Sequence, residues 1–237
     1  IVIEEGVTTI PSYTFNNSQI TSIVIPGSVT SIGDEAFSSC ESLSSVYYTG
    51  SITEWCKISF EGFSANPLNF SVSLYIGNEI LSGDIVIEDG VTTIPSYTFC
   101  HSRITSIKLP ESVTSIGWYA FYNCSELTGN LILPNNVTSI GKWAFYNCSG
   151  LTGNLILPET VIYIGSGAFS YCSGFTGELA IPQNIIEIWP SSFSYCSGLT
   201  GNIVIPDGIM TIGDQAFMQC SGLTGDLIIP NGITSIG

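Results

Sequence analysis

LTGNLILPNNVTSIGKWAFYNC, from Leu127 to Cys148, is followed by two close copies, LTGNLILPETVIYIGSGAFSYC from Leu151 and FTGELAIPQNIIEIWPSSFSYC from Phe175. Each copy runs through an aliphatic stretch to a proline, then through a second aliphatic pair to a phenylalanine and a cysteine. The phenylalanines recur at a step of 24 residues, at Phe121, Phe145, Phe169, Phe193 and Phe217. A strict period of this length predicts a solenoid, in which each repeat forms one coil that stacks on the next.

The residue types within one repeat predict how its coil is built. Leu155 and Leu157 alternate with Ile156, so the two leucines face the core and Ile156 faces outward from a strand. Pro158 ends this strand, because proline has no N–H to donate to the next coil. Further inward positions are predicted at Val161, Ile164, Ala168, Phe169 and Cys172. A short helical turn is predicted to begin at the Ala-Phe pair. We therefore expect the strands of successive coils to form a continuous parallel sheet on one face, with helical turns on the other.

Departures from the period mark a second feature of the chain. The steps from Phe15 to Phe37 and from Phe99 to Phe121 are 22 residues, and the step from Phe37 to Phe99 is 62. An insertion at about residues 49–80 therefore interrupts a single solenoid domain that spans residues 1–237.

The insertion has signals of its own. Ser51 and Glu54 have the spacing of a helix capping box, which predicts a short helix over Ile52 to Lys57. The segment from Leu74 to Leu81 reads as two short strands joined by Gly77-Asn78, which predicts a hairpin. We expect a packed helix-hairpin excursion that does not follow the repeat.

The recurring landmarks are Pro, Ile-Gly, Ala-Phe and Cys in the order L-x-x-(x)-I/L-x-I/L-P-x-x-V-x-x-I-G-x-x-A-F-x-x-C. This pattern resembles the BspA-like leucine-rich repeats of bacterial surface proteins, and it covers nearly all of the chain outside the insertion. The resemblance implies a curved leucine-rich-repeat solenoid that is exported to the cell surface and takes part in adhesion. Since the first residues already read as a strand and the last repeat stops before its Ala-Phe pair, we also expect a fragment of a longer array.

Charge and composition make some classes of partner unfavourable. The chain carries 19 acidic and 4 basic residues, for a net charge of −15. Nucleic acid is a poor partner, because few groups are present to neutralise phosphates. Direct membrane insertion by this segment is not expected either, since no hydrophobic run approaches the length of a membrane span.

Cysteines form a column in the repeat. Six of the eight lie three residues after a repeat phenylalanine, at Cys40, Cys124, Cys148, Cys172, Cys196 and Cys220. One cysteine in each coil predicts a column of small buried thiols. Disulfides between neighbouring coils are the alternative, although a repeating column offers no preferred pairing.

Catalytic chemistry finds little support in the sequence. His101 is the only histidine, and no nucleophile signature accompanies it. Carboxylate pairs occur at Glu4-Glu5, Asp34-Glu35 and Glu88-Asp89. The first and last precede glycine in turns, where solvated acidic residues are ordinary. The cysteines lack the clustering of zinc ligands. We therefore expect no enzyme, no catalytic residues, no metal and no cofactor.

Two surfaces remain as candidates for a partner. One is a row of outward residues along the sheet, with Tyr47, Lys108, Ile132, Ile156, Val204 and Ile228 as its candidate contacts. A nearly continuous apolar row is typical of a binding surface, although β-branched residues also simply favour strands. The other is an aromatic group on the helical side, with Trp118, Tyr119, Trp143 and Tyr146 as candidates. Such rings can stack on sugars or anchor a protein, and packing between coils is the alternative explanation.

The sequence thus favours a non-enzymatic cell-surface binding or adhesion module that presents a solenoid face to a protein or glycan. A structural spacer that projects another domain from the envelope is one alternative. A carbohydrate-binding adjunct of a glycan-degrading system is another, with Trp118 or Trp143 as the sugar contact.

Overall fold

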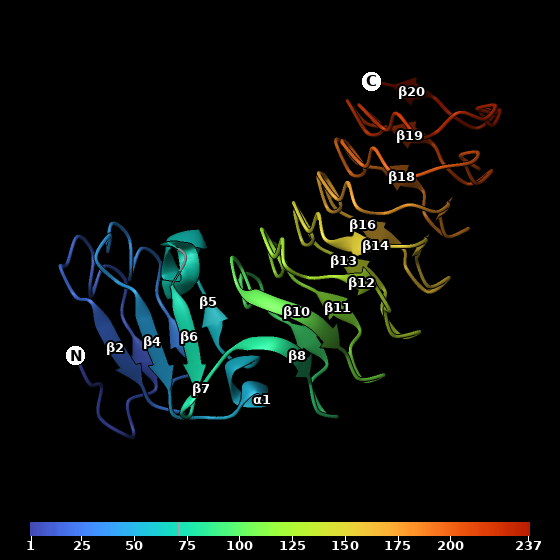
Figure 1. Ribbon diagram of the computed structural model, residues 1–237. Helices are drawn as coiled ribbons and strands as arrows, with labels where there is room; N and C mark the ends of the chain where they lie inside the picture. The colour runs from blue at the N-terminus through green and yellow to red at the C-terminus, as the bar shows by residue number, and fades with distance from the viewer. Residues whose placement is uncertain (71) are drawn as a thin grey trace.

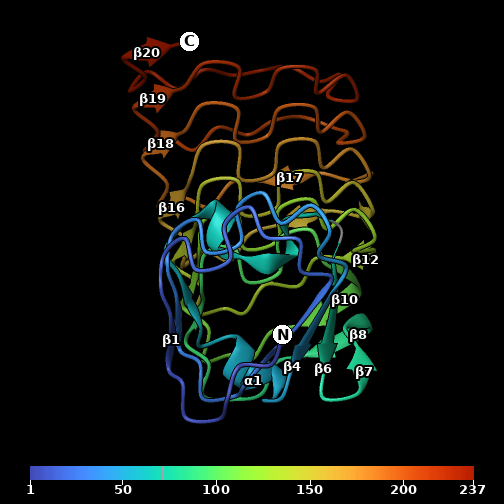
Figure 2. The same cartoon turned by 90° about the vertical axis from the view of Figure 1, so that its left-hand side faces the viewer.

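The structure is a computed structural model that describes residues 1–70 and 72–237, without the side chains of Asn69 and Phe70. The repeats form a parallel β-solenoid of about nine coils. Figure 1 shows that the stack is curved, with the N-terminal and C-terminal coils fanned apart. In Figure 2 the N-terminal coils lie in front and the later coils rise behind them. The predicted leucine-rich-repeat solenoid is confirmed.

One side of each coil carries the strand that precedes the repeat proline, and we call this side the first face. Within the described residues its strands fall into four sheets. These strands are β2 (Ser22–Ile25), β4 (Ser45–Tyr48), β6 (Ser73–Ile76), β7 (Glu79–Ile80), β8 (Ser82–Val86), β10 (Arg103–Lys108), β12 (Gly129–Asn130), β14 (Leu151–Thr152), β15 (Leu155–Ile156) and β17 (Leu179–Ala180).

The second face carries a two-residue strand from each coil, which a glycine follows in six of the ten cases. Its strands fall into three sheets, and all of them pair in parallel. These strands are β1 (Thr9–Ile10), β3 (Ser31–Ile32), β5 (Ser59–Phe60), β9 (Thr93–Ile94), β11 (Ser115–Ile116), β13 (Ser139–Ile140), β16 (Tyr163–Ile164), β18 (Glu187–Ile188), β19 (Thr211–Ile212) and β20 (Ser235–Ile236).

The third side, which we call the turn side, carries the Ala-Phe and Cys positions. Here the predicted helical turns are replaced by hydrogen-bonded turns, because the residues two before and two after the phenylalanine are left-handed. Around Phe145 these are Trp143 and Asn147, each with φ of 54°. Left-handed residues stop a right-handed helix from propagating. The Phe145 N–H instead donates to the Ala168 carbonyl of the next coil, at 2.8 Å.

The core fills the space between the three sides, as the repeat predicts. Leu155 and Leu157 are buried and Ile156 between them is exposed. The phenylalanines stack from coil to coil, with ring centroids between 5.0 and 5.9 Å apart from Phe99 to Phe217. Repeating columns of this kind bury apolar surface continuously along the stack.

The region around residues 49–80 contains the predicted helix, α1 (Ile52–Trp55), and the Ser51–Glu54 capping box is present. Two single-turn 3-10 helices follow, at Phe63–Ala65 and Pro67–Phe70. The predicted hairpin is formed by β6 and β7, in which Tyr75 pairs with Ile80.

The same region also forms a coil, which corrects the expectation of an excursion outside the repeat. β5 pairs in parallel with β3, and β6 pairs in parallel with β4. The Phe37 N–H donates to the Ser64 carbonyl, as the Phe15 N–H donates to the Ala36 carbonyl. Ala65 therefore occupies the phenylalanine position of this divergent coil.

The predicted continuous sheet is wrong as well. On the first face β7 runs antiparallel to β6 and ends that sheet, and β8 begins another one with β10. A second interruption lies within the 24-residue coils, which are two residues longer than the 22-residue coils. Gly129 has φ of 75°, and Gly129 and Asn130 pair with Leu151 and Thr152, 22 residues ahead. Leu155 pairs with Leu179, 24 residues ahead, so the register shifts between the two pairs.

Candidate functional site

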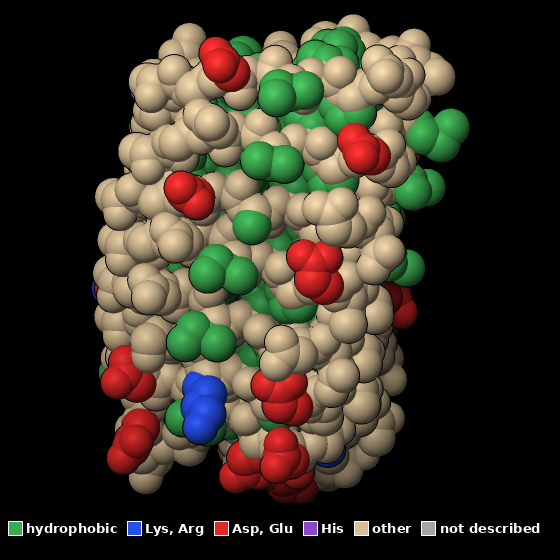
Figure 3. Space-filling model, turned by 90° about the vertical axis from the view of Figure 1, so that its right-hand side faces the viewer, with side chains coloured by type: hydrophobic (Ala, Val, Ile, Leu, Met, Phe, Trp, Pro, Cys, Tyr) green, Lys and Arg blue, Asp and Glu red, His purple; other side chains and the backbone are tan. Residues whose placement is uncertain are grey.

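A line of exposed aliphatic side chains crosses the first face from coil to coil. We call it the apolar row, and it consists of Ile132, Ile156, Ala180, Val204 and Ile228. Ile156 pairs with Ala180, and isolated bridges join Ala180 to Val204 and Val204 to Ile228, so the last four are direct neighbours. Figure 3 shows hydrophobic side chains aligned along this face. The exposed fractions are 77% for Ile132, 61% for Ile156, 67% for Val204 and 76% for Ile228.

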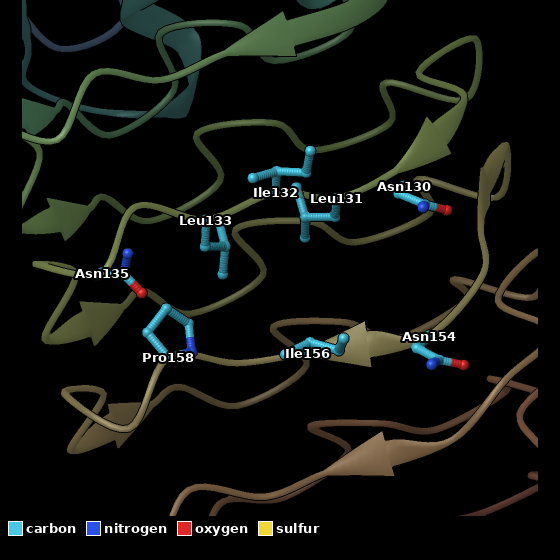
Figure 4. A pocket seen from close by; sticks show the side chains of 8 residues that line it. All are labelled: Asn130, Leu131, Ile132, Leu133, Asn135, Asn154, Ile156 and Pro158. Carbon is cyan, nitrogen blue, oxygen red and sulfur yellow. The ribbon is translucent and has the colours of Figure 1, made fainter.

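A groove of about 290 Å³ opens at the N-terminal end of the apolar row, between Ile132 and Ile156. Figure 4 shows the two chain segments that border it. Its walls are mostly apolar, with side-chain amides at the rim. The lining residues are Asn130, Leu131, Ile132, Leu133, Asn135, Asn154, Ile156 and Pro158.

The register shift explains why the groove exists. In the described part of the chain, no backbone-to-backbone hydrogen bond involves Leu131, Ile132 or Leu133. The segment that carries Ile132 is therefore not laddered to β15, and the two coils separate at the surface. Buried Leu131 and Leu133 still anchor the segment to the core.

Tyr47 and Lys108 lie on the first face but outside the apolar row and its groove. Tyr47 lies on β4, where its ring stacks on Tyr75 with centroids 4.6 Å apart. The β6–β7 hairpin ends that sheet. Lys108 pairs with Val86 in the separate β8–β10 sheet. Tyr47, Lys108 and the apolar row, which contains the other four predicted residues, thus lie in three separate parts of the first face.

Acidic residues flank the apolar row on both sides. Glu178 and Asp226 lie two residues before Ala180 and Ile228, and Glu159 and Asp207 lie three residues after Ile156 and Val204; all four are exposed. Figure 3 shows acidic side chains on both sides of the hydrophobic line. Residues 143–237 contain six acidic residues and no Lys, Arg or His. This surface therefore has a strongly negative rim.

On the turn side, three of the four predicted aromatic residues form a stack. Tyr119 contacts Trp143 at 4.8 Å, and Tyr146 stacks on Tyr122 at 4.8 Å between centroids. Burial, helped by the neighbouring Tyr97 and Tyr122, raises the pKa of Tyr119 to about 12. These rings are half-buried. Packing between coils accounts for their positions.

Trp118 differs from these rings, because 56% of it is exposed. The Lys142 ammonium lies 3.9 Å from the centroid of the Trp143 ring. A polar groove of about 350 Å³ lies elsewhere on this side, and its lining includes His101, Arg103 and Asn147.

The repeat pattern, the parallel coils and the columns of buried residues identify the family. Models of the BspA type leucine rich repeat region match residues 8–128, 82–200 and 119–237, with six copies. The chain belongs to the BspA-type leucine-rich repeat family. No curated protein sequence matches it.

Several solved structures resemble this BspA-type chain. A leucine-rich repeat protein from Eubacterium ventriosum is 20% identical, with a TM-score of 0.61 over 99% of this chain and 80% of that one. One from Bacteroides ovatus is 22% identical, with a TM-score of 0.52 over 100% and 74%. The pneumococcal vaccine antigen PcpA is 18% identical, with a TM-score of 0.53 over 98% and 72%. At these identities the likeness shows the fold alone.

The cysteine column of the BspA-type repeats is a column of thiols. Each of the six thiols donates to the carbonyl of a phenylalanine in the preceding coil, as Cys148 does to Phe121 at 3.1 Å. Burial raises the pKa of Cys124 and Cys172 to about 12. Such thiols are inert, because the thiolate is the reactive form.

The titratable groups outside the cysteine column include His101, the single histidine of the sequence. Burial lowers the pKa of His101, and its ring packs on Tyr122 with centroids 5.5 Å apart. Within the described residues, no group of three or more His, Cys, Asp or Glu side chains is placed to hold a metal ion. Over the same residues, no helix has the length and apolar character needed to cross a membrane.

A second exposed apolar row lies at the edge of the second face and was missed from sequence. It consists of Ile162, Ile186 and Met210, which are 58%, 61% and 54% exposed. Six other coils have threonine at this position, and in four of them the hydroxyl donates to a carbonyl of the preceding coil, as Thr138 does to Thr114. The replacement of threonine by an apolar residue in three consecutive repeats was the signal available in the sequence.

Proposed function

We propose that this chain is a non-enzymatic binding module displayed outside the cell, which holds a protein partner on its first face. The observation that carries the proposal is the apolar row, with its groove and its exposed Ile132, Ile156, Val204 and Ile228. A contiguous exposed apolar patch with a polar rim is characteristic of protein-binding surfaces. The row contains no aromatic ring, which makes it a poorer platform for sugars than for a protein.

Display outside the cell is supported by two features. PcpA, which has the same fold, is described as a pneumococcal vaccine antigen. The thiols of the cysteine column are buried, and burial raises the pKa of Cys124 and Cys172 to about 12, so such thiols are compatible with an oxidising environment.

The test measures binding of the fluorescently labelled chain to intact cells by flow cytometry. The variant carrying Ile132→Lys, Ile156→Lys and Val204→Lys should lose binding, because it places three charges in the apolar row. The matched control carries Ile162→Lys, Ile186→Lys and Met210→Lys on the second face and should bind normally. Protease treatment of the cells should abolish binding and glycosidase treatment should not.

Three results would overturn the proposal. These are unchanged binding by the first-face variant, equal loss in the matched control, and binding that glycosidases remove. A chain that binds no cell type would instead favour the structural spacer. Thermal unfolding of each variant checks that the fold is intact.

A glycan on the turn side is the second candidate function. The polar groove lined by His101, Asn123 and Asn147 lies beside Tyr122, whose ring contacts His101. Amides next to aromatic rings suit the polar edges and apolar faces of sugars. Quenching of Trp118 or Trp143 fluorescence by polysaccharides, abolished by Asn123→Ala, would favour this candidate.

A further inference from the structure

We infer that the segment bound by the first face is a basic amphipathic α-helix of the partner protein, lying along the apolar row. The inference rests on the proposed function, since it specifies what occupies the same surface. Three properties of the row point to it: the spacing of its side chains, the groove at one end, and the charge on both sides.

Spacing distinguishes a helix from an extended peptide. Neighbouring paired strands lie about 4.8 Å apart, so the three paired steps from Ile156 to Ile228 span about 14 Å. An α-helix presents one side chain per turn on a given face, about every 5.4 Å, and needs about 10 residues for this length. An extended strand presents same-face side chains about 6.6 Å apart. The helix therefore stays close to the period of the row, whereas the strand falls out of step within two or three coils.

The relief of the row also suits a helix with large apolar side chains. The groove of about 290 Å³ between Ile132 and Ile156 offers one place for such a side chain. Ala180, between Ile156 and Val204, leaves a second and shallower depression, because it is the smallest side chain in the row. Anchor side chains that fill pockets supply most of the binding energy at interfaces.

The acidic residues beside the row favour a partner segment with positive charge. Glu178 and Asp226 lie on one side of the row, and Glu159 and Asp207 lie on the other. No cationic side chain follows Lys142 in the sequence. A helix with lysine or arginine on both flanks of an apolar stripe is complementary to this arrangement, whereas an acidic helix is repelled.

The probe is a fluorescein-labelled 18-residue peptide with leucines at helical spacing, lysines beside the leucine stripe, and alanines on the far side. One control peptide has the same composition with leucine and lysine alternating, as in a strand. A second control replaces each lysine with glutamate. Fluorescence anisotropy at physiological salt should show that the helical basic peptide binds about tenfold or more tighter than either control.

The protein variants locate the site. Ile156→Ser, Val204→Ser and Ile228→Ser together should weaken binding of the helical peptide about tenfold or more. The matched control, Ile162→Ser, Ile186→Ser and Met210→Ser, removes three side chains of similar exposure and should leave the Kd within about twofold.

Charge variants test the rim separately. Glu178→Gln with Asp207→Asn should weaken binding about threefold or more and flatten its dependence on salt. Glu187→Gln with Asp214→Asn changes the net charge equally at positions outside the rim and should have little effect. An equal loss with both pairs would show general electrostatic attraction and overturn the inference.

Equal affinity for the alternating peptide, or equal weakening by the second-face control, also overturns the inference. The cell-binding test separates this failure from failure of the proposed function. If the first-face lysine variant loses cell binding while the helical peptide does not bind, the binding face stands and the helical partner is wrong. If that variant still binds cells, the proposed function itself fails.

Discussion

Two kinds of coil stack on their neighbours in different ways: the regular coils from Phe99 to Phe217, and the divergent coil at about residues 49–80. The regular coils repeat one solution, in which a phenylalanine, a buried thiol or serine and a backbone ladder occupy the same place each time. The divergent coil has Ala65 at the phenylalanine position, and the sheets of both faces end beside it.

Individual side chains join the divergent coil to the next one. The buried Trp55 indole donates to the Thr98 carbonyl at 3.0 Å. In the regular coils the equivalent carbonyl, such as that of Ala120, accepts from the backbone N–H of the preceding phenylalanine. The Asn66 amide donates to the Tyr97 carbonyl, and the Phe63 ring contacts Tyr119. A ladder made by the backbone is thus replaced by contacts that depend on particular side chains.

The largest expected effect is destabilisation of the regular coils by alkaline pH, because most of the buried thiols lie there. The divergent coil holds one such thiol, Cys56, whose pKa burial raises to about 12. Burial raises the pKa of Cys124 and Cys172 to about 12, and those of Cys148 and Cys196 well above the ordinary value. An unfolded chain loses these protons near pH 8.5. The folded chain therefore holds more protons above that pH, and its stability, full below about pH 8.5, falls as the pH rises toward 12.

Each such thiol contributes a loss of about 1.4 kcal/mol per pH unit, so four together contribute about 5 kcal/mol per unit near pH 10. Urea unfolding under reducing conditions at pH 8, 9, 10 and 11 measures the slope. Hydrogen exchange should show the coils with Cys124 to Cys220 opening before residues 1–48. Cys148→Ala with Cys172→Ala removes two of the seven thiols whose pKa is raised by burial, and should lower the slope by about 2.7 kcal/mol per pH unit. A flat profile in the parent chain would contradict the buried thiols.

Truncation of one phenylalanine tests the regular column. Phe145 stacks on Phe121 at 5.0 Å and on Phe169 at 5.3 Å between centroids. Phe145→Ala should lower the free energy of unfolding by about 3–5 kcal/mol, because the cavity is enclosed by neighbouring coils. Phe145→Leu is the volume-conserving control and should cost less than about 1.5 kcal/mol.

The divergent coil should be destabilised by the reverse substitution. Ala65 is fully buried, so Ala65→Phe, which restores the repeat residue, should destabilise by about 1–3 kcal/mol through overpacking. A stabilising effect in urea unfolding would show that this coil is only a degraded copy of the others.

The sequence was sufficient to predict the coils and their core side chains, but not the conformation of the turns, which are not helical. The step of 24 residues between phenylalanines predicted the coils, and alternation around Ile156 predicted which side chains face the core. The thiol column followed from one cysteine per repeat. The row on the first face was predicted as a line, but its groove was not, because the groove depends on a register shift at Gly129 that residue types do not reveal.

The divergent coil was misread for a similar reason. Its sequence lacks the Pro and Phe landmarks of the repeat, so pairing of β5 with β3 is visible only in three dimensions. The contact between Trp55 and Thr98 joins residues 43 apart and leaves no local signal. The repeating coils can thus be predicted from the sequence, whereas the packing of an interrupted coil is seen only in the three-dimensional structure.

Removing one hydrogen bond at the junction gives the smallest and most specific test of this comparison. Trp55→Phe keeps an aromatic ring beside Tyr48 and Phe60 but leaves the buried Thr98 carbonyl without its indole donor. Leaving a buried acceptor unsatisfied costs about 1–3 kcal/mol. Because the backbone ladders of both faces end beside this coil, the loss should weaken the coupling between the two parts of the stack as well as the overall stability.

Urea unfolding followed by circular dichroism should then resolve two transitions in the Trp55→Phe variant where the parent chain shows one. Trp189→Phe is the matched control, since Trp189 is half-buried and contacts Tyr163 through its ring alone. It should cost less than about 1 kcal/mol and preserve a single transition. If Trp55→Phe behaves like this control, packing at the junction is enough to couple the two parts of the stack. The hydrogen bond from the Trp55 indole would then not be what holds them together.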